Sequence, residues 1–286
     1  MKIAQTIVVV GDIHSELALA AAALDRVEEQ FGPIAQVFSV GDVGLFLERG
    51  DWEFLTGPKK HRHPERSGEI AAAWKEWRWP LSMIGGNHEP YQWLREFASQ
   101  RFGGHLDYIN AGILSHHVPG LQVYGLSGIH HPEHMTFASG ENPTGARPRQ
   151  WVDLVQLAAA KKVSLKRLTY YKQTEIDRLL ALPRAPDLLL LHDWPVPPPH
   201  VRGSTRRPER DIVERLAPKY VCSGHHHTPA EIMLGPSRFI GLNIISSREE
   251  LRRRAVSPGW AAIFSWDGSE LERCAIWPAA RRLPVV

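Results

Sequence analysis

The sequence predicts an α/β fold, because apolar strand-like runs alternate with amphipathic helical segments. Near the N-terminus "TIVVV" runs into "GD", which is typical of a buried strand followed by a glycine-containing loop. Apolar residues then recur at three- and four-residue steps from Leu17 to Phe31, which predicts one helical stripe. The strand and Gly-Asp arrangement recurs in "QVFSVGD", and "LSMIGGNHE" is a further strand before the amphipathic "PYQWLREFASQ". In such folds the functional loops lie at the carboxyl ends of the strands.

The rest of the chain continues this pattern with one interruption. "ILSHHV" and "LQVYGLSG" predict a hairpin, and "PDLLLLHDWP" predicts another buried strand that ends in a polar loop. Between them, residues 131–150 lose periodicity and residues 151–182 are helical in pattern, so we expect an excursion from the core at 131–182 that borders the site. Four strand-like segments follow at the C-terminal end, namely "AEIMLG", "RFIGLNII", "GWAAIFSWDG" and "LERCAIW".

Length and composition indicate an ordinary globular protein. A chain of 286 residues with 43% hydrophobic and 23% charged residues suits one core, and we expect a single domain over 1–286. The two cysteines, Cys222 and Cys274, are too few for a disulfide framework, which favours a reducing compartment. The N-terminal stretch has neither the apolar length of a signal peptide nor that of a spanning helix. We therefore expect a cytoplasmic protein that does not interact with membranes.

The net charge of +3 is unevenly distributed along the chain. Residues 141–184 hold nine Lys and Arg against four Asp and Glu, and residues 195–254 hold eleven against six. One interpretation is that these segments form solvated helix and loop surfaces. The other is that an anionic partner, such as RNA or single-stranded nucleic acid, approaches this side of the molecule.

Potential metal ligands follow five of the predicted strands. Any one of them alone is more often a helix cap or a surface histidine, but five occurrences, each after an apolar strand, predict a metal site. They are Asp12 and His14 in "GDIHSE", Asp42 in "SVGDVG", Asn87 and His88 in "GGNHEP", His192 in "LLHDWP", and His225, His226 and His227 in "SGHHHTP".

Residue spacing selects among these candidates. Residues two apart in an extended segment point the same way, so Asp12 can face one ion together with His14, and His225 can do so with His227. His226 would point elsewhere, and we interpret it as an exposed imidazole that binds no metal.

The donor set indicates two metal ions in a catalytic setting. Carboxylates, imidazoles and one amide without a thiolate suit Mn, Fe, Co or Zn in a catalytic site better than a closed structural zinc. Seven ligands are too many for one ion with an open position, whereas two divalent ions about 3.5–4 Å apart that share a carboxylate would use them all. Such a pair lowers the pKa of a bridging water and holds a phosphoryl group for in-line attack.

These blocks, in this order, resemble the calcineurin-like metallophosphoesterases, whose signature runs D-x-H, G-D, G-N-H-E, a lone His and G-H-x-H. The likeness extends from about residue 7 to residue 230. It implies a four-layer αββα sandwich with a dinuclear site between two sheets. By position it implies that Asp12, His14 and His227 bind the first metal, that Asn87, His192 and His225 bind the second, and that Asp42 bridges both. His88 would be the acid that protonates the leaving oxygen, a role that its near-neutral ordinary pKa suits.

Several stretches over about residues 80–200 are similar to RNA lariat debranching enzymes, including "SMIGGNHEPYQWL", "RLTYYKQTEIDRL" and "LLLLHDWPVP". Those enzymes have Cys where this chain has Asp12, which argues against strict specificity for 2′,5′ branches. Protein phosphatases have an Asp-Arg-Gly after the bridging aspartate, whereas "GDVGLF" has Leu45 in place of that aspartate. This difference argues against protein phosphatase activity.

The expected function is a dinuclear metal-dependent phosphodiesterase with Mn, Fe or Zn that acts on nucleotide or nucleic-acid phosphodiesters. The enzymatic alternative is a phosphatase of small phosphomonoesters or dinucleoside polyphosphates. A binding scaffold on an inactive fold is the third alternative, and the seven intact ligand positions argue against it. Trp74, Trp77 and Trp79 could stack on bases, but tryptophans beside an amphipathic helix are more often part of the core.

Overall fold

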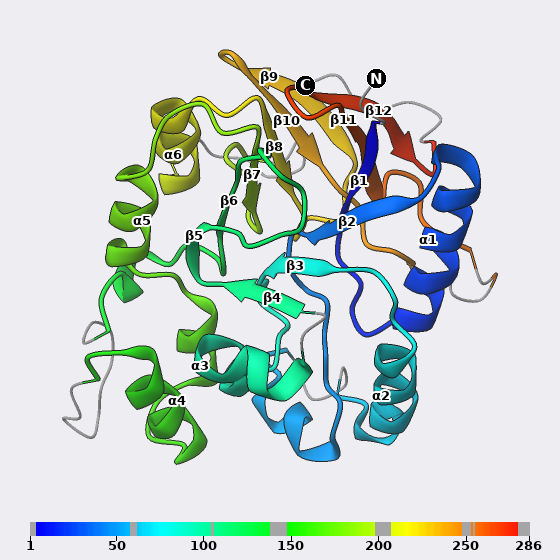
Figure 1. Ribbon diagram of the computed structural model, residues 1–286. Helices are drawn as coiled ribbons and strands as arrows, with labels where there is room; N and C mark the ends of the chain where they lie inside the picture. The colour runs from blue at the N-terminus through cyan, green and yellow to red at the C-terminus, as the bar shows by residue number, and fades with distance from the viewer. Residues whose placement is uncertain are drawn as a thin grey trace.

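The computed structural model describes residues 4–57, 62–103, 106–137, 148–197, 207–247, 253 and 255–279. Over these residues the chain forms two six-stranded sheets with helices on their outer faces, so the predicted α/β class is confirmed. Figure 1 shows α1 and α2 on one side of the molecule, α5 and α6 on the opposite side, and the sheets between them.

The first sheet has the strand order β12-β11-β1-β2-β3-β4. Its strands β1 to β4 run parallel to one another, and β11 and β12 extend it in antiparallel fashion beside β1. The strands are β1 (Gln5–Val10), β2 (Ile34–Ser39), β3 (Leu81–Ile84), β4 (Leu106–Ile109), β11 (Ala261–Trp266) and β12 (Leu271–Trp277).

The second sheet has the strand order β5-β6-β7-β8-β10-β9, with β6, β7, β8 and β10 parallel. The predicted hairpin is confirmed as the antiparallel pair β5–β6, although β5 begins before the expected "ILSHHV" segment. The strands are β5 (Ala111–Ile113), β6 (Val123–Leu126), β7 (Leu188–Leu191), β8 (Tyr220–Ser223), β9 (Ala230–Leu234) and β10 (Ser237–Gly241).

Six α-helices and four short 3-10 helices lie in the described residues. The α-helices are α1 (Leu17–Phe31), α2 (Ser67–Lys75), α3 (Tyr91–Phe102), α4 (Trp151–Ala159), α5 (Gln173–Leu180) and α6 (Pro208–Leu216). The 3-10 helices are η1 (Arg49–Phe54), η3 (Pro64–Arg66), η4 (Pro132–His134) and η5 (Leu165–Thr169).

Three hydrophobic clusters show that the molecule has four layers. Successive strand residues point to opposite faces, so in β1 Val8 packs with the helix α1 cluster while Ile7 packs between the two sheets. In β7 Leu188 faces the space between the sheets, and Leu189 packs with α5 and α6. The continuously apolar strand runs thus reflect burial on both faces. The αββα sandwich that the resemblance implied is confirmed.

The excursion at 131–182 has two parts with different locations. The helices α4 and η5 pack together, and α4 lies beside α3 in the helical layer of the first sheet. The helix α5 returns to cover β5 and β6 of the second sheet. Residues 138–147 of the excursion lie outside the described residues.

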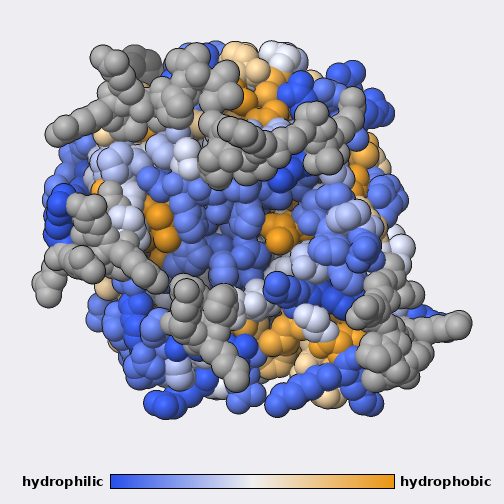
Figure 2. All heavy atoms as spheres, turned by 180° about the vertical axis from the view of Figure 1, so that it is seen from behind, coloured by the Kyte–Doolittle hydropathy of each residue, from blue (hydrophilic) through white to orange (hydrophobic). Residues whose placement is uncertain are grey.

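The described surface is mainly hydrophilic on the face opposite to that of Figure 1, and its hydrophobic patches there are small and separate (Figure 2). No helix in the described part of the chain combines the length and apolarity needed to cross a bilayer.

Candidate metal centre

All five predicted ligand loops follow parallel strands at one edge of the sandwich. Three of them follow β1, β2 and β3 of the first sheet, and two follow β7 and β8 of the second. Because the carboxyl ends of parallel strands meet at the same edge, side chains far apart in sequence converge there.

The backbone of these loops differs from the extended conformation that we expected. His14, Asp42, His225 and His227 have positive φ angles of 47°, 53°, 66° and 49°, in the left-handed region. Non-glycine residues rarely adopt this region, and such conformations concentrate at functional sites. The extended geometry that we assumed is therefore wrong for these loops. Asp12 and His14 do lie together, but His225 and His227, which we expected to face one ion, lie in different groups.

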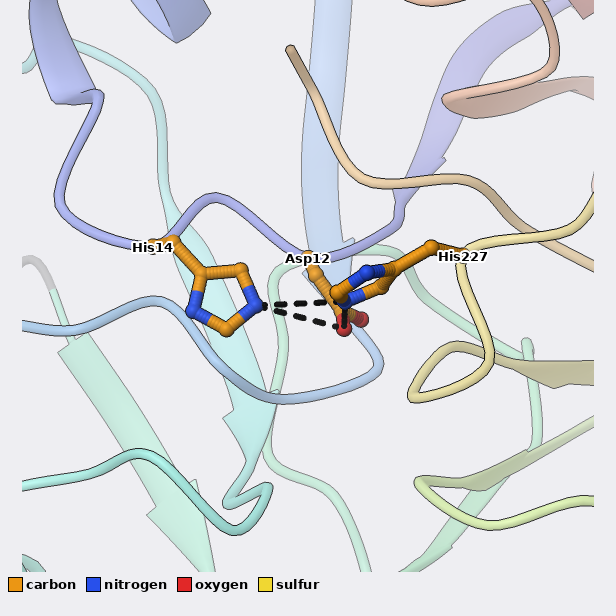
Figure 3. A group of neighbouring side chains, drawn as sticks. All are labelled: Asp12, His14 and His227. Carbon is orange, nitrogen blue, oxygen red and sulfur yellow. Dashed lines mark hydrogen bonds and ion pairs between the residues drawn. The ribbon is translucent and has the colours of Figure 1, made fainter. Parts of the chain in front are cut away.

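Asp12, His14 and His227 form the first group of donors (Figure 3). The buried carboxylate of Asp12 lies 2.8 Å from His227 Nε2 and 3.7 Å from His14 Nε2, both measured at Oδ2. The two Nε2 atoms face each other at 3.3 Å. Three potential ligand atoms from loops more than 200 residues apart in sequence thus converge on one point.

His192 and Asn87 form the second group, with the ring of His225 beside it, and the ligand atoms of His225 also lie close to those of Asp193 and His226. His192 Nε2 lies 3.1 Å from Asn87 Oδ1, and the rings of His192 and His225 are 5.0 Å apart. The other ring nitrogen, Nδ1 of His192, lies 2.8 Å from the carbonyl oxygen of Val40. Since a carbonyl only accepts, Nδ1 must carry a proton, which leaves Nε2 as the ring atom that could bind a metal.

Asp42 lies between the two groups. Its Oδ2 is 3.7 Å from His14 Nε2 and 3.5 Å from His192 Nε2, and its Oδ1 accepts a hydrogen bond of 2.6 Å from the backbone N–H of His88. Burial alone would raise the pKa of Asp42, but the charges of His192 and His88 lower it well below its ordinary value. Burial alone would lower the pKa of His192. The negative charge of Asp42 stabilises the protonated ring, outweighs burial and raises the pKa of His192 to about 10.

Two glycines allow the loops to approach these carboxylates. A Cβ atom at Gly224 would lie 2.0 Å from Asp12 Oδ1, and one at Gly86 would lie 2.1 Å from Asp42 Oδ1. Only glycine therefore fits before His225 and before Asn87. Apposed imidazole nitrogens, buried carboxylate oxygens and an amide oxygen form a donor set that fits divalent cations.

His88 points away from its neighbour Asn87. Its ring lies 5.3 Å from that of His14 and lines a cavity beside the centre, while Asn87 faces His192. Burial lowers the pKa of His88 below its ordinary value. The ring of His88 is thus at the edge of the centre, where a substrate can reach it.

The interpretation of His226 as an exposed bystander is wrong. Its Nε2 lies 3.0 Å from Asp193 Oδ1, and only 15% of its side chain is exposed. Asp193 also accepts from the backbone N–H of Trp194 at 2.8 Å and forms an ion pair of 2.7 Å with Arg207. His226 therefore ties the loop after β8 to the loop after β7.

Asp193 and Glu89 are functional candidates that we did not identify from the sequence. The buried carboxylate of Glu89 accepts from the backbone N–H groups of Val43 at 2.8 Å and Gly44 at 3.0 Å, and thereby holds the loop that carries Asp42. Burial and the nearby Asp42 charge raise the pKa of Glu89 to about 8. One signal was available, because each of these acids directly follows a candidate residue, in "HD" and "HE".

Other residues that we considered lie outside the centre. Trp74, Trp77 and Trp79 belong to the core and do not line the cavity beside the centre, so they are not placed to stack on a substrate there.

A cavity of about 860 Å³ adjoins the centre on the side of His14, His88 and His227. Its remaining lining residues come from the segment between β2 and α2, from the loop that precedes α1, and from the connection between β10 and β11. Among the described residues of the excursion, which we expected to border the site, none lines this cavity.

Comparisons with known proteins agree with this geometry. A family model described as calcineurin-like phosphoesterase matches residues 5–229. The chain is similar to a lariat debranching enzyme from Caenorhabditis briggsae, with 26% identity over 66% of this chain and 36% of that protein. It is also similar to a lariat debranching enzyme from Arabidopsis thaliana, with 22% identity over 79% of this chain and 54% of that protein. The chain thus spans about a third to a half of the length of these curated relatives.

Solved structures support the fold. One crystal structure superposes with a TM-score of 0.51 at 12% identity, over 96% of this chain and 100% of the other. At this identity the likeness concerns the fold alone.

Proposed function

Because this chain belongs to the calcineurin-like phosphoesterase family, we propose that it is a dinuclear metal-dependent phosphodiesterase that hydrolyses nucleotide or nucleic-acid phosphodiesters. The family match supports hydrolysis of a phosphoester as the reaction. The similarity to proteins named lariat debranching enzymes supports a diester substrate with a nucleic-acid component.

The position of Asp42 is the observation that carries the proposal. One oxygen of this buried carboxylate lies within 3.7 Å of an imidazole nitrogen of each donor group. A carboxylate so placed can bridge two cations, and its charge would offset the repulsion between them.

The metal ligands follow from this arrangement. Asp12, His14 and His227 would hold one cation, Asn87, His192 and His225 would hold the other, and Asp42 would contact both. The donor set suits Mn, Fe or Zn, because it contains oxygen and imidazole donors and no thiolate. Two divalent cations held there would supply Lewis acidity, which polarises the phosphoryl group and favours deprotonation of water at neutral pH.

His88 is the proposed general acid. Hydrolysis forms a bond between the oxygen of water and phosphorus and breaks the bond from phosphorus to the leaving oxygen, which takes the electron pair. A proton from the ring of His88 then neutralises that oxygen. The hydrogen bond from the backbone N–H of His88 to Asp42 fixes the ring relative to the centre.

An Asp42→Asn substitution tests the dinuclear centre. The variant keeps the shape of the side chain and removes the charge, so we expect metal content to fall from two equivalents to one or fewer, and turnover of bis(p-nitrophenyl) phosphate to be lost. Asp177→Asn is the control, because Asp177 is an exposed carboxylate on α5. Elemental analysis and steady-state rates measure both effects. Two bound metals with normal turnover in Asp42→Asn would contradict the proposal.

Substrate preference separates the proposed diesterase from a monoesterase. We expect the metal-loaded enzyme to hydrolyse bis(p-nitrophenyl) phosphate with a higher kcat/KM than p-nitrophenyl phosphate. A clear preference for the monoester would favour the phosphatase of small phosphomonoesters instead.

A further inference from the structure

The cavity beside the candidate centre has two chemically different walls. One wall is apolar and consists of the largely buried side chains of Phe46, Trp52 and Leu55, in the segment between β2 and α2. There the rings of Phe46 and Trp52 stack at 4.5 Å, and Leu55 lies next to them in the lining. Such a wall suits a flat apolar group, because burial of aromatic surface against it is favourable.

The opposite wall comes from the connection between β10 and β11, and it is polar. Asn243 Nδ2 donates to the carbonyl oxygen of Pro258 at 3.0 Å, and Ser246 Oγ donates to that of Ala255 at 3.0 Å. These bonds fix the orientation of the two side chains. A hydroxyl that donates one bond still has lone pairs, and an amide has a second N–H, so both groups can recognise the polar edge of a ligand.

The charge of the cavity argues against a second phosphate. Arg66 is the one Lys or Arg that lines the cavity among the described residues. Its guanidinium is already bound to both oxygens of Glu16, at 2.7 and 3.1 Å, and to Glu69 at 3.0 Å. Glu16 lines the cavity as well, so an anionic ligand would meet a carboxylate beside the only guanidinium.

The position of His88 determines which part of the substrate would occupy the cavity. His88 lines the cavity and is the proposed donor of the proton to the leaving oxygen. The leaving group must therefore lie on the cavity side of the phosphoryl group.

We propose that this cavity is the leaving-group subsite and that it takes an uncharged nucleoside rather than a group that carries its own phosphate. The nucleobase would lie against the apolar wall and present its polar edge to Asn243 and Ser246. This inference rests on the proposed function, and it narrows the substrate to a phosphodiester whose leaving group is a nucleoside hydroxyl. Dinucleoside polyphosphates, whose leaving group is a charged nucleotide, are excluded.

An Ile244→Trp substitution tests the subsite, because Ile244 lines the cavity and is only partly buried. The larger side chain would fill space that the nucleoside needs. Ile113→Trp is the matched control, since Ile113 is 57% exposed at the end of β5 and does not line the cavity. Metal content and thermal unfolding establish that both variants remain folded and loaded.

The assay compares a dinucleoside monophosphate, a dinucleoside triphosphate and methyl p-nitrophenyl phosphate. In the wild type we expect kcat/KM for the dinucleoside monophosphate to exceed that for the triphosphate. In Ile244→Trp the ratio of dinucleoside monophosphate to methyl p-nitrophenyl phosphate turnover should fall about tenfold or more, as steric changes in a specificity pocket produce. Ile113→Trp should keep the wild-type ratio.

The outcomes separate this inference from the proposed function. If the metal-loaded wild type hydrolyses none of these esters, the proposed function fails. If it hydrolyses the diesters but prefers the triphosphate, or if Ile244→Trp keeps the wild-type ratio, the subsite is refuted while the phosphodiesterase proposal stands.

Discussion

His88 and Asn87 are adjacent in sequence, yet their side chains contact different parts of the candidate centre. Asn87 faces His192, whereas the ring of His88 lies beside His14 at the edge of the cavity. The hydrogen bond from the backbone N–H of His88 to Asp42 keeps the two side chains pointing in different directions. A side chain in this position can transfer a proton without serving as a metal ligand.

A His88→Ala substitution should separate proton transfer from metal binding. We expect the variant to keep both metals and to lose about 10²- to 10⁴-fold in rate, which is the usual contribution of a general acid. The loss should be much smaller for p-nitrophenyl esters, because p-nitrophenolate leaves without protonation. His117→Ala, at an exposed loop position, should leave the rates unchanged. An equal loss of rate for good and poor leaving groups would instead assign His88 a structural role.

At the scale of elements, a buried cluster of cations joins the excursion to α3 and α5. The guanidinium of Arg95 lies over the ring of Trp151 at 3.7 Å and donates to the carbonyl oxygen of Leu168 at 2.8 Å. Lys172 Nζ donates to the carbonyl oxygen of His134 at 2.9 Å. Glu175 is 3.5 Å from Arg95. Burial, together with the charge of Arg95, lowers the pKa of Lys172 to about 7.

This lowered pKa makes stability depend on pH in the alkaline range. Between pH values of about 7 and 10.5, Lys172 binds a proton in the unfolded chain but not in the folded one. Because the unfolded state binds more protons than the folded state over this window, the free energy of unfolding should increase as the pH rises from about 7 to 10.5. In Lys172→Met this increase should be absent. Chemical denaturation of both proteins at several pH values measures the difference.

Lys162→Met is the control for that experiment, because Lys162 is exposed at the end of α4. Its free energy of unfolding should follow that of the wild type across the window. Parallel pH profiles for the wild type and Lys172→Met would show that Lys172 is protonated in the folded protein.

At the scale of the whole molecule, the first basic segment, at 141–184, contains the stretch "KKVSLKR" over residues 161–167, and its cations are not all exposed. Lys161, Lys162 and Lys166 are exposed, but Arg167 is only 2% exposed and donates to the carbonyl oxygen of Phe137. Arg167 cannot contact a polyanion from its buried position. The second basic segment, at 195–254, lies partly outside the described residues, which omit 198–206, 248–252 and 254.

Salt dependence tests whether the three exposed lysines contact an oligonucleotide. Replacing Lys161, Lys162 and Lys166 with Ala should weaken binding to single-stranded RNA and flatten the salt slope by about 0.7 for each phosphate contact that is lost. Hydrolysis of bis(p-nitrophenyl) phosphate should be nearly unchanged, because none of these lysines lines the cavity. If the triple variant binds RNA like the wild type at every salt concentration, the stretch is only a solvated surface.

The sequence by itself determined most of the strands, the helices α1, α3, α4 and α5, and the set of converging loops, whereas β4, α2 and α6 were not predicted. Runs such as "TIVVV" and "LLLL" specify strands buried on both faces, because their apolar character is a local property. The loops after β1, β2, β3, β7 and β8 then had to meet, since parallel strands place their carboxyl ends at one edge. All eight candidate side chains were predicted to lie there for this reason.

Only the tertiary structure decided the partners of those side chains. His226 binds Asp193, 33 residues earlier, and Arg167 enters the interior and donates to the carbonyl oxygen of Phe137, 30 residues earlier. The left-handed conformations of His14, Asp42, His225 and His227 likewise depend on the surrounding loops. The physical reason is that hydrophobic periodicity reports which way a local segment faces, whereas a polar side chain reaches its final environment only when distant segments supply its hydrogen bonds and charges.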